Sequence, residues 1–326
     1  MMRDLIHIVD PFDVPWSGSA LEALELYDLL CTHANVRLWA HGVPHDFYKD
    51  RPIVAISPTN CPAGGTLIIV GAYYEPRQWL ESSHFSRVII KYNSISHVML
   101  FRLVSRLRQT NLPEPSFVFP SQFLKNTIGL PGLVEPSPIS LSTFTPSTER
   151  HQRPYTIGRH SRDILYKYSE DDPSLCRMLA LQGHQVRIMG GTCLSPYMKT
   201  TTPNIELLPA GIQPAADFLR SLDCFIYRTL PGWFETFGRV VLEAMACGLP
   251  VVCERNGGYV ECIQHGKNGF LFDTQEEAWE SLQRLSKDAE LRAEIGREAR
   301  KTTEEIYHSK HQARYRAWYL ENTTAE

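Results

Sequence analysis

The chain has 326 residues, of which 43% are hydrophobic and 21% charged, and its formal net charge is −3. This length exceeds that of a usual single domain and predicts two domains of about 150 residues each. This small net charge gives no electrostatic reason to expect a nucleic-acid partner.

The cysteines and the N-terminus indicate a cytoplasmic protein. No two of the eight cysteines are three positions apart, so no C-x-x-C pair is present, and several lie in apolar runs where a reduced thiol acts as a small hydrophobic residue. The N-terminal apolar run is too short for a signal peptide, and no run approaches the ~18 apolar residues of a membrane span. We expect a cytoplasmic location, at most peripheral at the inner face of the membrane.

Short apolar runs in the first half of the chain predict parallel strands. They are near-continuously apolar, as in strands covered on both faces, and comprise residues 5–9, 36–40, 66–70, 87–92 and 117–119. Residues 20–33 are amphipathic and predict a helix that completes a β-α-β unit. Gly18 and Ser19 are the first residues of this helix, and its N-terminus offers an anion site for either of two ligands, one that donates a chemical group or one that accepts it.

Residues 98–108 predict an amphipathic helix with two alternative roles. Leu100, Leu103, Val104 and Leu107 share one face, while Arg102, Arg106 and Arg108 lie on the others. The helix either packs on the core with a charged outer side or contacts a membrane surface, because basic amphipathic helices attract anionic lipids.

Residues 131–154 contain five prolines and many Ser and Thr residues, which is typical of a linker. The strand pattern then resumes at residues 155–158, 186–191, 205–211, 224–228, 249–253 and 269–272. The predicted architecture is α/β, with two Rossmann-like doubly wound domains, 1–147 and 148–310, facing across a cleft. A ligand is expected at the carboxyl ends of the strands.

Several common motifs are absent from the sequence. No two glycines are separated by one residue, so the dinucleotide fingerprint G-x-G-x-x-G cannot occur, and no P-loop or H-E-x-x-H is present. No D-x-D pair occurs, so no metal site and no cofactor are predicted. Asp172 stands before a proline, and this spacing predicts an N-cap followed by the first residue of a helix.

The stretch from Glu235 to Glu243 predicts a ligand site at the start of a helix. The apolar pattern after the strand at 224–228 places the helix start near Phe237, so the backbone amides of Gly238, Arg239 and Val240 would be unpaired donors at its positive end. Glu235 lies just before the helix, and Glu243 can lean back toward the same pocket.

Two carboxylates would repel a phosphate alone, but they can accept hydrogen bonds from hydroxyl groups on either side of one. A nucleotide-sugar, with its sugar, diphosphate and ribose, has this layout. The alternative reading is that both glutamates only complement the helix dipole.

The same stretch resembles the C-terminal half of retaining GT-B glycosyltransferases of family GT4. Glu235 and Glu243 match the E-x7-E motif of that family. The glycine-rich pattern that follows is matched by Gly257, Gly258, Glu261, Ile263, Gly266 and Gly269. The resemblance covers about 155–310 and implies the GT-B fold, in which a final helix, here about 311–326, packs back on the first domain.

The resemblance implies a role for each matched position. Glu235 would bind hydroxyls of the donor hexose, Glu243 the ribose diol, and the amides of Phe237, Gly238, Arg239 and Val240 the distal phosphate and sugar. Loops containing Gly190 and Pro209 would flank the base, and Gly18 and Ser19 would face the cleft, where related enzymes often have two glycines.

The family also places an arginine and a lysine at the diphosphate, in a G-R-x(4)-K type pattern. Arg159 follows a glycine and pairs with Lys167 in our preferred assignment, while Arg162 has the shorter spacing to Lys167 and is the reserve. Two such cations would stabilise the leaving group without a metal. Solvated positions in a loop are the alternative for these residues.

The predicted function is a metal-independent retaining glycosyltransferase of polysaccharide biosynthesis. It would move a hexose from a nucleoside-diphosphate sugar, with UDP-hexose favoured, to a hydroxyl of a glycan or a lipid-linked acceptor. The alternatives are a GT-B-like protein that binds a nucleotide or glycan without catalysis, and a sugar epimerase on the same scaffold. None of the six histidines in the first domain is assigned a catalytic role.

Overall fold

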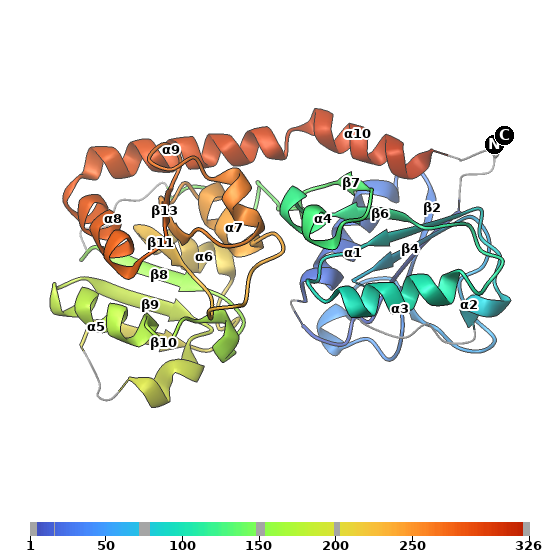
Figure 1. The fold of residues 1–326 in the computed structure, drawn as a ribbon, viewed down its shortest axis with the longest axis horizontal. Coiled ribbons are helices and arrows are strands. Elements are labelled where there is room, and N and C mark those ends of the chain that lie inside the picture. The colour runs from blue at the N-terminus through green and yellow to red at the C-terminus, as the bar shows by residue number, and fades with distance from the viewer. Residues whose placement is uncertain (1–4, 16, 72–78, 148–153, 199–202, 322–326) are drawn as a thin grey trace. The chain divides into compact units, whose positions relative to one another are not determined.

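The residues that the computed structural model describes are 5–15, 17–71, 79–147, 154–198 and 203–321 (Figure 1). The chain folds into two compact units, Met1–Pro138 with Ser309–Glu326 and Ile139–His308. The division follows Pro138, whereas the sequence places it after residue 147. Ile139 and Phe144 are buried in the core of the second unit, so residues 139–147 of the expected linker belong to that unit, whereas its first residues, 131–138, belong to the first unit. Residues 148–153 of the linker lie outside the described part.

The first unit contains a parallel sheet with the strand order β3-β2-β1-β4-β5-β6-β7. Its strands are β1 (Leu5–Asp10), β2 (Asn35–Ala40), β3 (Ile53–Ala55), β4 (Thr66–Val70), β5 (Arg87–Lys91), β6 (Ser116–Phe119) and β7 (Leu133–Val134). In the centre, Ile6 of β1 pairs with Val36 on one side and Thr66 on the other. The five long strands lie where the apolar runs predict them. The short edge strands β3, three apolar residues long, and β7, two residues long, were not predicted.

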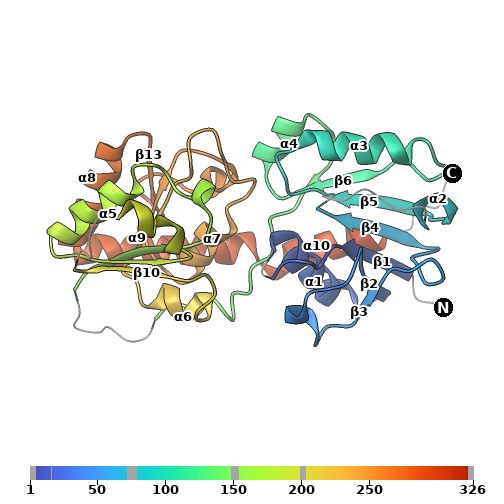
Figure 2. The same ribbon diagram turned by 90° about the horizontal axis from the view of Figure 1, so that it is seen from below.

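Helices cover both faces of this sheet (Figure 2). The helices α1 (Gly18–Leu30) and α10 (Ser309–Leu320) pack on one face, and α2 (Trp79–Ser82), α3 (His97–Leu107) and α4 (Gln122–Ile128) pack on the other. Successive side chains of a strand point to opposite faces, so the near-continuous apolar runs supply both layers of the core.

The helix α3 buries the leucine-rich face predicted from its periodicity, Leu100, Leu103, Val104 and Leu107. Two of its arginines form ion pairs within the unit. Arg106 lies 2.7 Å from a carboxylate oxygen of Glu81, and Arg108 lies 3.1 Å from one of Glu114. These pairs reduce the positive charge that the outer side of α3 presents.

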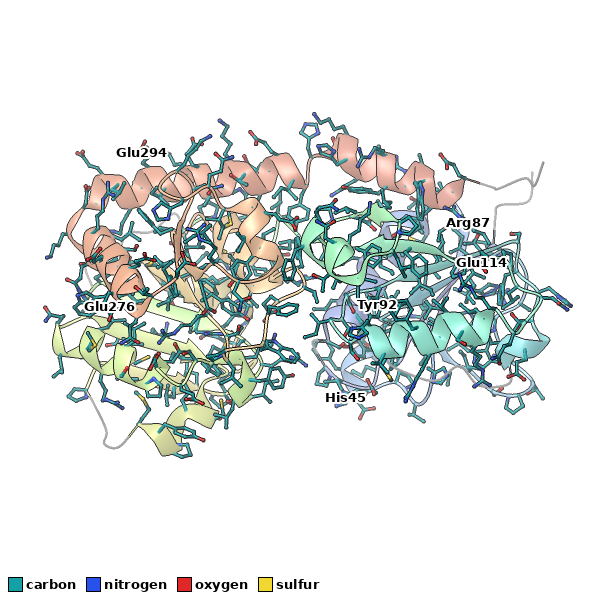
Figure 3. All side chains as sticks on the ribbon, in the orientation of Figure 1. His45, Arg87, Tyr92, Glu114, Glu276 and Glu294 are labelled. Carbon is teal, nitrogen blue, oxygen red and sulfur yellow. The ribbon has the colours of Figure 1, made fainter. Side chains whose placement is uncertain are left out.

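The C-terminal helix expected over 311–326 begins at Ser309 and belongs to the first unit, and residues 322–326 lie outside the described part. Arg87, labelled in Figure 3, donates a 2.7 Å hydrogen bond to the carbonyl of Trp318, and its guanidinium lies 4.3 Å from the centre of the Trp318 indole. The hydroxyl of Tyr319 donates to Glu135 at 2.6 Å, and the same carboxylate pairs with Lys91. These buried polar contacts hold α10 on the sheet.

The second unit contains another parallel sheet, with the order β10-β9-β8-β11-β12-β13. Its strands are β8 (Thr156–His160), β9 (Gln185–Met189), β10 (Ile205–Leu208), β11 (Cys224–Tyr227), β12 (Val251–Glu254) and β13 (Phe270–Phe272). The order reverses between β8 and β11, and open α/β sheets bind ligands at such a point, beyond the carboxyl ends of the strands.

Helices again lie on both faces of the sheet (Figures 1 and 2). The helices α5 (Asp172–Leu181) and α8 (Gln275–Lys287) cover one face, while α6 (Ala215–Arg220) and α7 (Arg239–Ala246) cover the other. The long helix α9 (Ala289–Ile306) packs against both α7 and α8. Three short 3-10 segments complete the unit, η2 (Leu165–Lys167), η3 (Thr192–Tyr197) and η4 (Gly258–Cys262).

Within the described residues, no helix has the length and apolar character needed to cross a membrane.

Candidate functional site

Lys167 and Glu235 form an ion pair at the carboxyl edge of the second sheet. Lys167 ends η2, and Glu235 lies in the loop between β11 and α7. The Lys167 ammonium donates to Glu235 Oε1, and the Tyr227 hydroxyl donates to the same oxygen at 2.6 Å. Burial by itself raises the pKa of Glu235, but the Lys167 charge and the two hydrogen bonds outweigh it and hold the pKa below its usual range. Glu235 is therefore an ionised carboxylate at neutral pH.

Arg159 lies beneath this pair rather than beside it. Its side chain is 3% exposed, and its two terminal nitrogens donate at 2.7 Å to the backbone carbonyls of Arg228 and Lys167. The guanidinium lies between the rings of Tyr168 and Tyr227, 4.5 and 4.2 Å from their centres. These contacts differ from the expected contact with a diphosphate. By donating to the Lys167 carbonyl, Arg159 fixes the backbone at Lys167.

Asp172 is part of the same buried network. Its carboxylate accepts a 2.6 Å hydrogen bond from Arg228 Nε and lies 3.6 Å from Arg159. The expected N-cap role is incorrect, because Asp171 is the N-cap and Asp172 is the first residue of α5. One carboxylate therefore pairs with two buried arginines and offsets one of their two positive charges, which lowers the cost of burying them in a low-dielectric interior.

Arg162, the reserve in the sequence assignment, lies on the exposed side of the site. Its guanidinium is 5.7 Å from the centre of the Tyr166 ring, and the Lys167 ammonium is 5.9 Å from the centre of the same ring. The charge of Arg162 is also among the causes that lower the pKa of Glu235. Arg162, Lys167 and Glu235 therefore share one neighbourhood, and Arg162 is the arginine that a ligand can reach there.

The glycines of the predicted motif shape the loop that carries Glu235. Gly238 has a φ of +82° and precedes α7, which begins at Arg239. Gly257 has a φ of +105°, and a Cβ there would come 2.6 Å from the Glu235 carbonyl oxygen. The amide of Gly258 donates to that carbonyl at 2.8 Å. The glycine pattern after residue 256 thus packs directly on the Glu235 backbone.

The first residues of α7 present backbone and not side chains to a ligand. The Phe237 ring is 4% exposed and belongs to the core. The helix starts after Gly238, so the amides of Arg239 and Val240 lie in its first turn. They can donate to an anion at the positive end of the helix dipole.

Glu243 reaches back toward the sheet edge, where it contacts two cationic or polar groups. Arg239 Nε lies 2.8 Å from one carboxylate oxygen, and His160 Nε2 lies 3.2 Å from the other. Burial alone raises the pKa of Glu243, but the contacts with His160 and Arg239 outweigh it, so the pKa is lowered. The carboxylate is ionised and 6% of the residue is exposed, so a ribose diol would have to compete with these two contacts.

The two loop residues expected near a nucleotide base follow neighbouring strands. Gly190 follows β9 with a φ of +83°, and a Cβ there would come 2.0 Å from the Ser161 carbonyl oxygen. Its own carbonyl accepts a 2.5 Å hydrogen bond from Tyr168. Pro209 follows β10 and is exposed. Both lie at the carboxyl edge that carries Lys167.

Gly18 and Ser19 lie in the first unit, at the start of α1. Ser19 is buried, with its hydroxyl 3.0 Å from that of Ser17, and it also interacts with the Asp10 carboxyl group at the end of β1. Asp10 Oδ1 accepts from the Phe12 amide at 2.9 Å, whereas Oδ2 has no hydrogen-bond partner among the described residues. Burial, with smaller contributions from the nearby charges of Asp13 and Glu22, raises the pKa of Asp10 to about 7.

Because the pKa of Asp10 is raised in the folded protein, we expect the free energy of unfolding to depend on pH. Between pH 4 and 7 the folded chain binds a proton at Asp10 that the unfolded chain has released, so the free energy of unfolding falls as pH rises through this range. Asp10→Asn removes the cost and should be more stable than the wild type by an amount that grows from pH 4 to 7, up to on the order of 3–4 kcal/mol. Urea unfolding at pH 4.5, 6 and 8 measures this. A difference that does not change with pH would contradict the assignment.

Sequence reasoning did not identify four side chains of the site, Tyr166, Tyr227, Trp233 and His160. Tyr227 ends β11, a strand that the apolar run at 224–228 predicts, and Trp233 follows Pro231 and Gly232 in the turn after that strand. Because successive side chains of a strand point to opposite faces, the strand pattern places Tyr227 on one face of the sheet. No local pattern indicates that its hydroxyl contacts Glu235. His160 follows Arg159 directly, and only the strand geometry turns it toward Glu243.

No three His, Cys, Asp or Glu side chains within the described ranges come together in a way that could hold a metal ion.

Comparison with known proteins identifies the fold and finds a family match within the second unit. Residues 212–302 match the family model described as glycosyl transferases group 1. N-acetyl-alpha-D-glucosaminyl L-malate synthase of Bacillus anthracis is 46% identical over 78 residues, which are 23% of this chain and 20% of that protein. D-inositol 3-phosphate glycosyltransferase of Pseudarthrobacter chlorophenolicus is 38% identical over 96 residues, 29% of this chain and 22% of that protein. The chain thus matches about a fifth of the length of these relatives.

The whole chain is similar in structure to HepE of Anabaena, solved in complex with UDP and glucose. The TM-score is 0.74 at 14% identity, over 98% of this chain and 99% of that chain. Two parallel α/β units of this kind define a GT-B glycosyltransferase fold, and the chain has that fold. Residues 212–302, which include the E-x7-E motif, match the model of the glycosyl transferases of group 1, so the resemblance seen in this part of the sequence is confirmed.

Proposed function

We propose that the protein is a retaining glycosyltransferase that moves a hexose from a nucleoside-diphosphate sugar to a hydroxyl of a glycan or lipid-linked acceptor in polysaccharide biosynthesis. Lys167 and Arg162 bind the diphosphate, and Glu235 binds the hexose. Glu243 accepts from the ribose diol, and the amides of Arg239 and Val240 contact the distal phosphate and the sugar. Arg159 acts on the reaction through the backbone that carries Lys167.

The observation that carries the proposal is the arrangement around Glu235. An ionised carboxylate, a lysine and an exposed arginine meet at the switch point of a parallel sheet, beside the start of a helix. The cations and amides suit a pyrophosphate, and the carboxylate suits sugar hydroxyls. As the glycosidic bond breaks, negative charge grows on the distal phosphate, and preorganised cations stabilise that charge most strongly in the transition state.

UDP-hexose is the favoured donor. The fold neighbour HepE was solved with UDP and glucose and with UDP-glucose. The likeness to HepE supports the fold, and its ligands suggest which donors to test first. The base itself would lie near Gly190 and Pro209, where backbone groups make the contacts.

The direct test is sugar transfer or slow hydrolysis from a panel of UDP-, GDP- and ADP-hexoses, with and without EDTA. We expect turnover with one donor class, UDP-hexose first, and unchanged turnover after chelation, because Lys167 and Arg162 take the part of a metal at the diphosphate. Retention is checked from the anomeric configuration of the product. Thermal stabilisation by nucleotide with no transfer from any donor would instead indicate a binding protein, and release of an isomerised nucleotide-sugar would indicate an epimerase.

We also propose, from the sequence, that residues 98–108 contact the membrane surface peripherally. The reaction would then take place on the cytoplasmic side. The exposed side chains of Val98, Phe101 and Arg102 support it. The ion pairs of Arg106 and Arg108 weigh against it. Flotation with anionic liposomes tests it directly, since Phe101→Ser with Arg102→Glu should reduce flotation if α3 contacts lipid.

A further inference from the structure

Trp233 lies in the loop between β11 and α7, two residues before Glu235, and its backbone is held in place on both sides. Its amide donates to the Leu230 carbonyl at 2.9 Å. Its carbonyl accepts from Thr229 Oγ1 and from Asn256 Nδ2, each at 2.9 Å. Three hydrogen bonds at one residue fix the position from which the indole ring projects.

The ring of Trp233 packs on the ring of Tyr166. Their centres are 4.5 Å apart with an angle of 43° between the planes. The Leu230 amide donates to the Tyr166 carbonyl at 3.3 Å, which links the two segments. Both residues are half-buried, and neither belongs to the buried core of the second unit. The two rings therefore form an aromatic wall at the sheet edge, defined here as Tyr166 and Trp233.

The indole N–H of Trp233 is buried and has no hydrogen-bond acceptor among the described residues. Buried Trp N–H groups usually find an acceptor, so an orphan of this kind requires an explanation. An oxygen of a bound ligand or a bound water molecule would provide one.

The aromatic wall faces the polar half of the site. The Lys167 ammonium lies 5.9 Å from the centres of both rings, within the range of cation–π attraction. The same ammonium binds Glu235. One side of this small region is therefore made of charged hydrogen-bonding groups, and another side is made of flat apolar surface.

A pyranose ring has the same two-sided character. Its hydroxyls lie around the edge, and its C–H groups give it a face that packs on aromatic rings, whereas a pyrophosphate has no apolar face. Binding sites for small polar ligands commonly combine apolar walls with a few placed polar groups. A hexose whose hydroxyls reach Glu235 and whose C–H face lies on the wall would satisfy both sides.

We propose that Trp233 and Tyr166 form the subsite for the hexose ring of the donor and determine how strongly the enzyme prefers a nucleotide-sugar over the free nucleotide. The inference rests on the proposed function, because it assumes that Glu235 and Lys167 bind a nucleoside-diphosphate sugar. It adds two residues outside the E-x7-E motif that act on the sugar and not on the nucleotide.

The test compares the affinities of the full chain for UDP and for UDP-glucose by calorimetry. In Trp233→Ala we expect the Kd of UDP to stay within about twofold and the Kd of UDP-glucose to rise roughly tenfold, the size of a lost stacking contact with its buried area. Trp233→Phe keeps a flat ring and should retain most of the affinity. Tyr166→Leu is the second variant and should show the same selective loss if Trp233→Ala fails to fold.

The matched control is Leu165→Ala. Leu165 is the exposed neighbour of Tyr166 in the same short segment, and its truncation should change neither Kd. In steady state, Trp233→Ala should raise the donor KM and leave the acceptor KM unchanged.

Two outcomes would overturn the inference while leaving the proposed function intact. Equal weakening of UDP and UDP-glucose would show that the wall acts on the nucleotide, and a change confined to the acceptor KM would show that the wall serves the acceptor. If the wild-type chain bound neither UDP, GDP nor ADP nor any of their hexose derivatives, the proposed function would fail, and the sugar subsite with it.

Discussion

Glu235→Gln should reduce sugar transfer by roughly 100-fold to 1000-fold, the size of effect seen when one preorganised polar group is removed from an active site. The substitution keeps the shape of the side chain and the hydrogen bond from Tyr227, but it removes the charge that Lys167 faces. The Lys167 ammonium is then buried without its anion. Removing one partner of a buried ion pair costs about 3–5 kcal/mol of stability, so the unfolding midpoint should also fall.

Two comparisons separate catalysis from stability in this prediction. The double variant Lys167→Met with Glu235→Gln replaces both charges and should recover much of the lost stability but none of the activity. Glu276→Gln changes an exposed glutamate in the first turn of α8, visible in Figure 3, and should alter neither. If Glu235→Gln retained more than a third of wild-type turnover, the hexose-binding role of Glu235 would be wrong.

Gly238→Ala should destabilise the protein by about 3–5 kcal/mol, because it combines an unfavourable backbone conformation with a steric clash. The φ of Gly238 is +82°, and an added Cβ would come 2.3 Å from Cδ1 and 2.9 Å from Cβ of Tyr259. Tyr259 is fully buried, and its hydroxyl donates to the Glu254 carbonyl at 2.9 Å. The ring cannot move away without opening the core, so the start of α7 and the Glu235 loop must shift. Transfer activity should fall with stability.

Gly232→Ala is the matched control for the clash. Gly232 has the same φ of +82° and lies in the same loop, but an added Cβ meets nothing within 4 Å. It should cost only the 1–2 kcal/mol or so of a left-handed non-glycine residue. Urea denaturation of the two variants gives the difference directly. Equal costs for Gly232→Ala and Gly238→Ala would mean that contact with Tyr259 does not constrain the helix start.

The pattern of apolar residues was sufficient to predict the two sheets. Most of the long strands are near-continuous apolar runs, and such runs have few stable environments other than a buried parallel strand. The glycine and glutamate spacing after β11 was also informative, because left-handed glycines such as Gly238 and Gly257 are local backbone requirements. The edge strands β3 and β7 were missed because they are only three and two residues long, too short for a clear periodic pattern.

The assignment of the arginines shows where local reasoning stops. Arg159 and Arg162 are both cations a few residues before Lys167, and charge and spacing do not separate them. The structure separates them by burial, since Arg159 lies between two tyrosine rings and under Asp172, whereas Arg162 is exposed. Burial is a property of the surrounding elements, in this case β11 and α5, which are distant in sequence.

The sequence by itself determined the class of fold, the sheet edge at which we propose that the ligand binds and the presence of two carboxylates beside a helix start, because periodicity and turn chemistry act over a few residues. The tertiary structure alone decided which groups meet at that edge. The partners of Glu235 come from η2 and β11, those of Glu243 from β8 and α7, and the aromatic wall from η2 and the loop between β11 and α7. Contacts between side chains far apart in the chain depend on how the strands are ordered and how deeply each group is buried, and no local pattern records either.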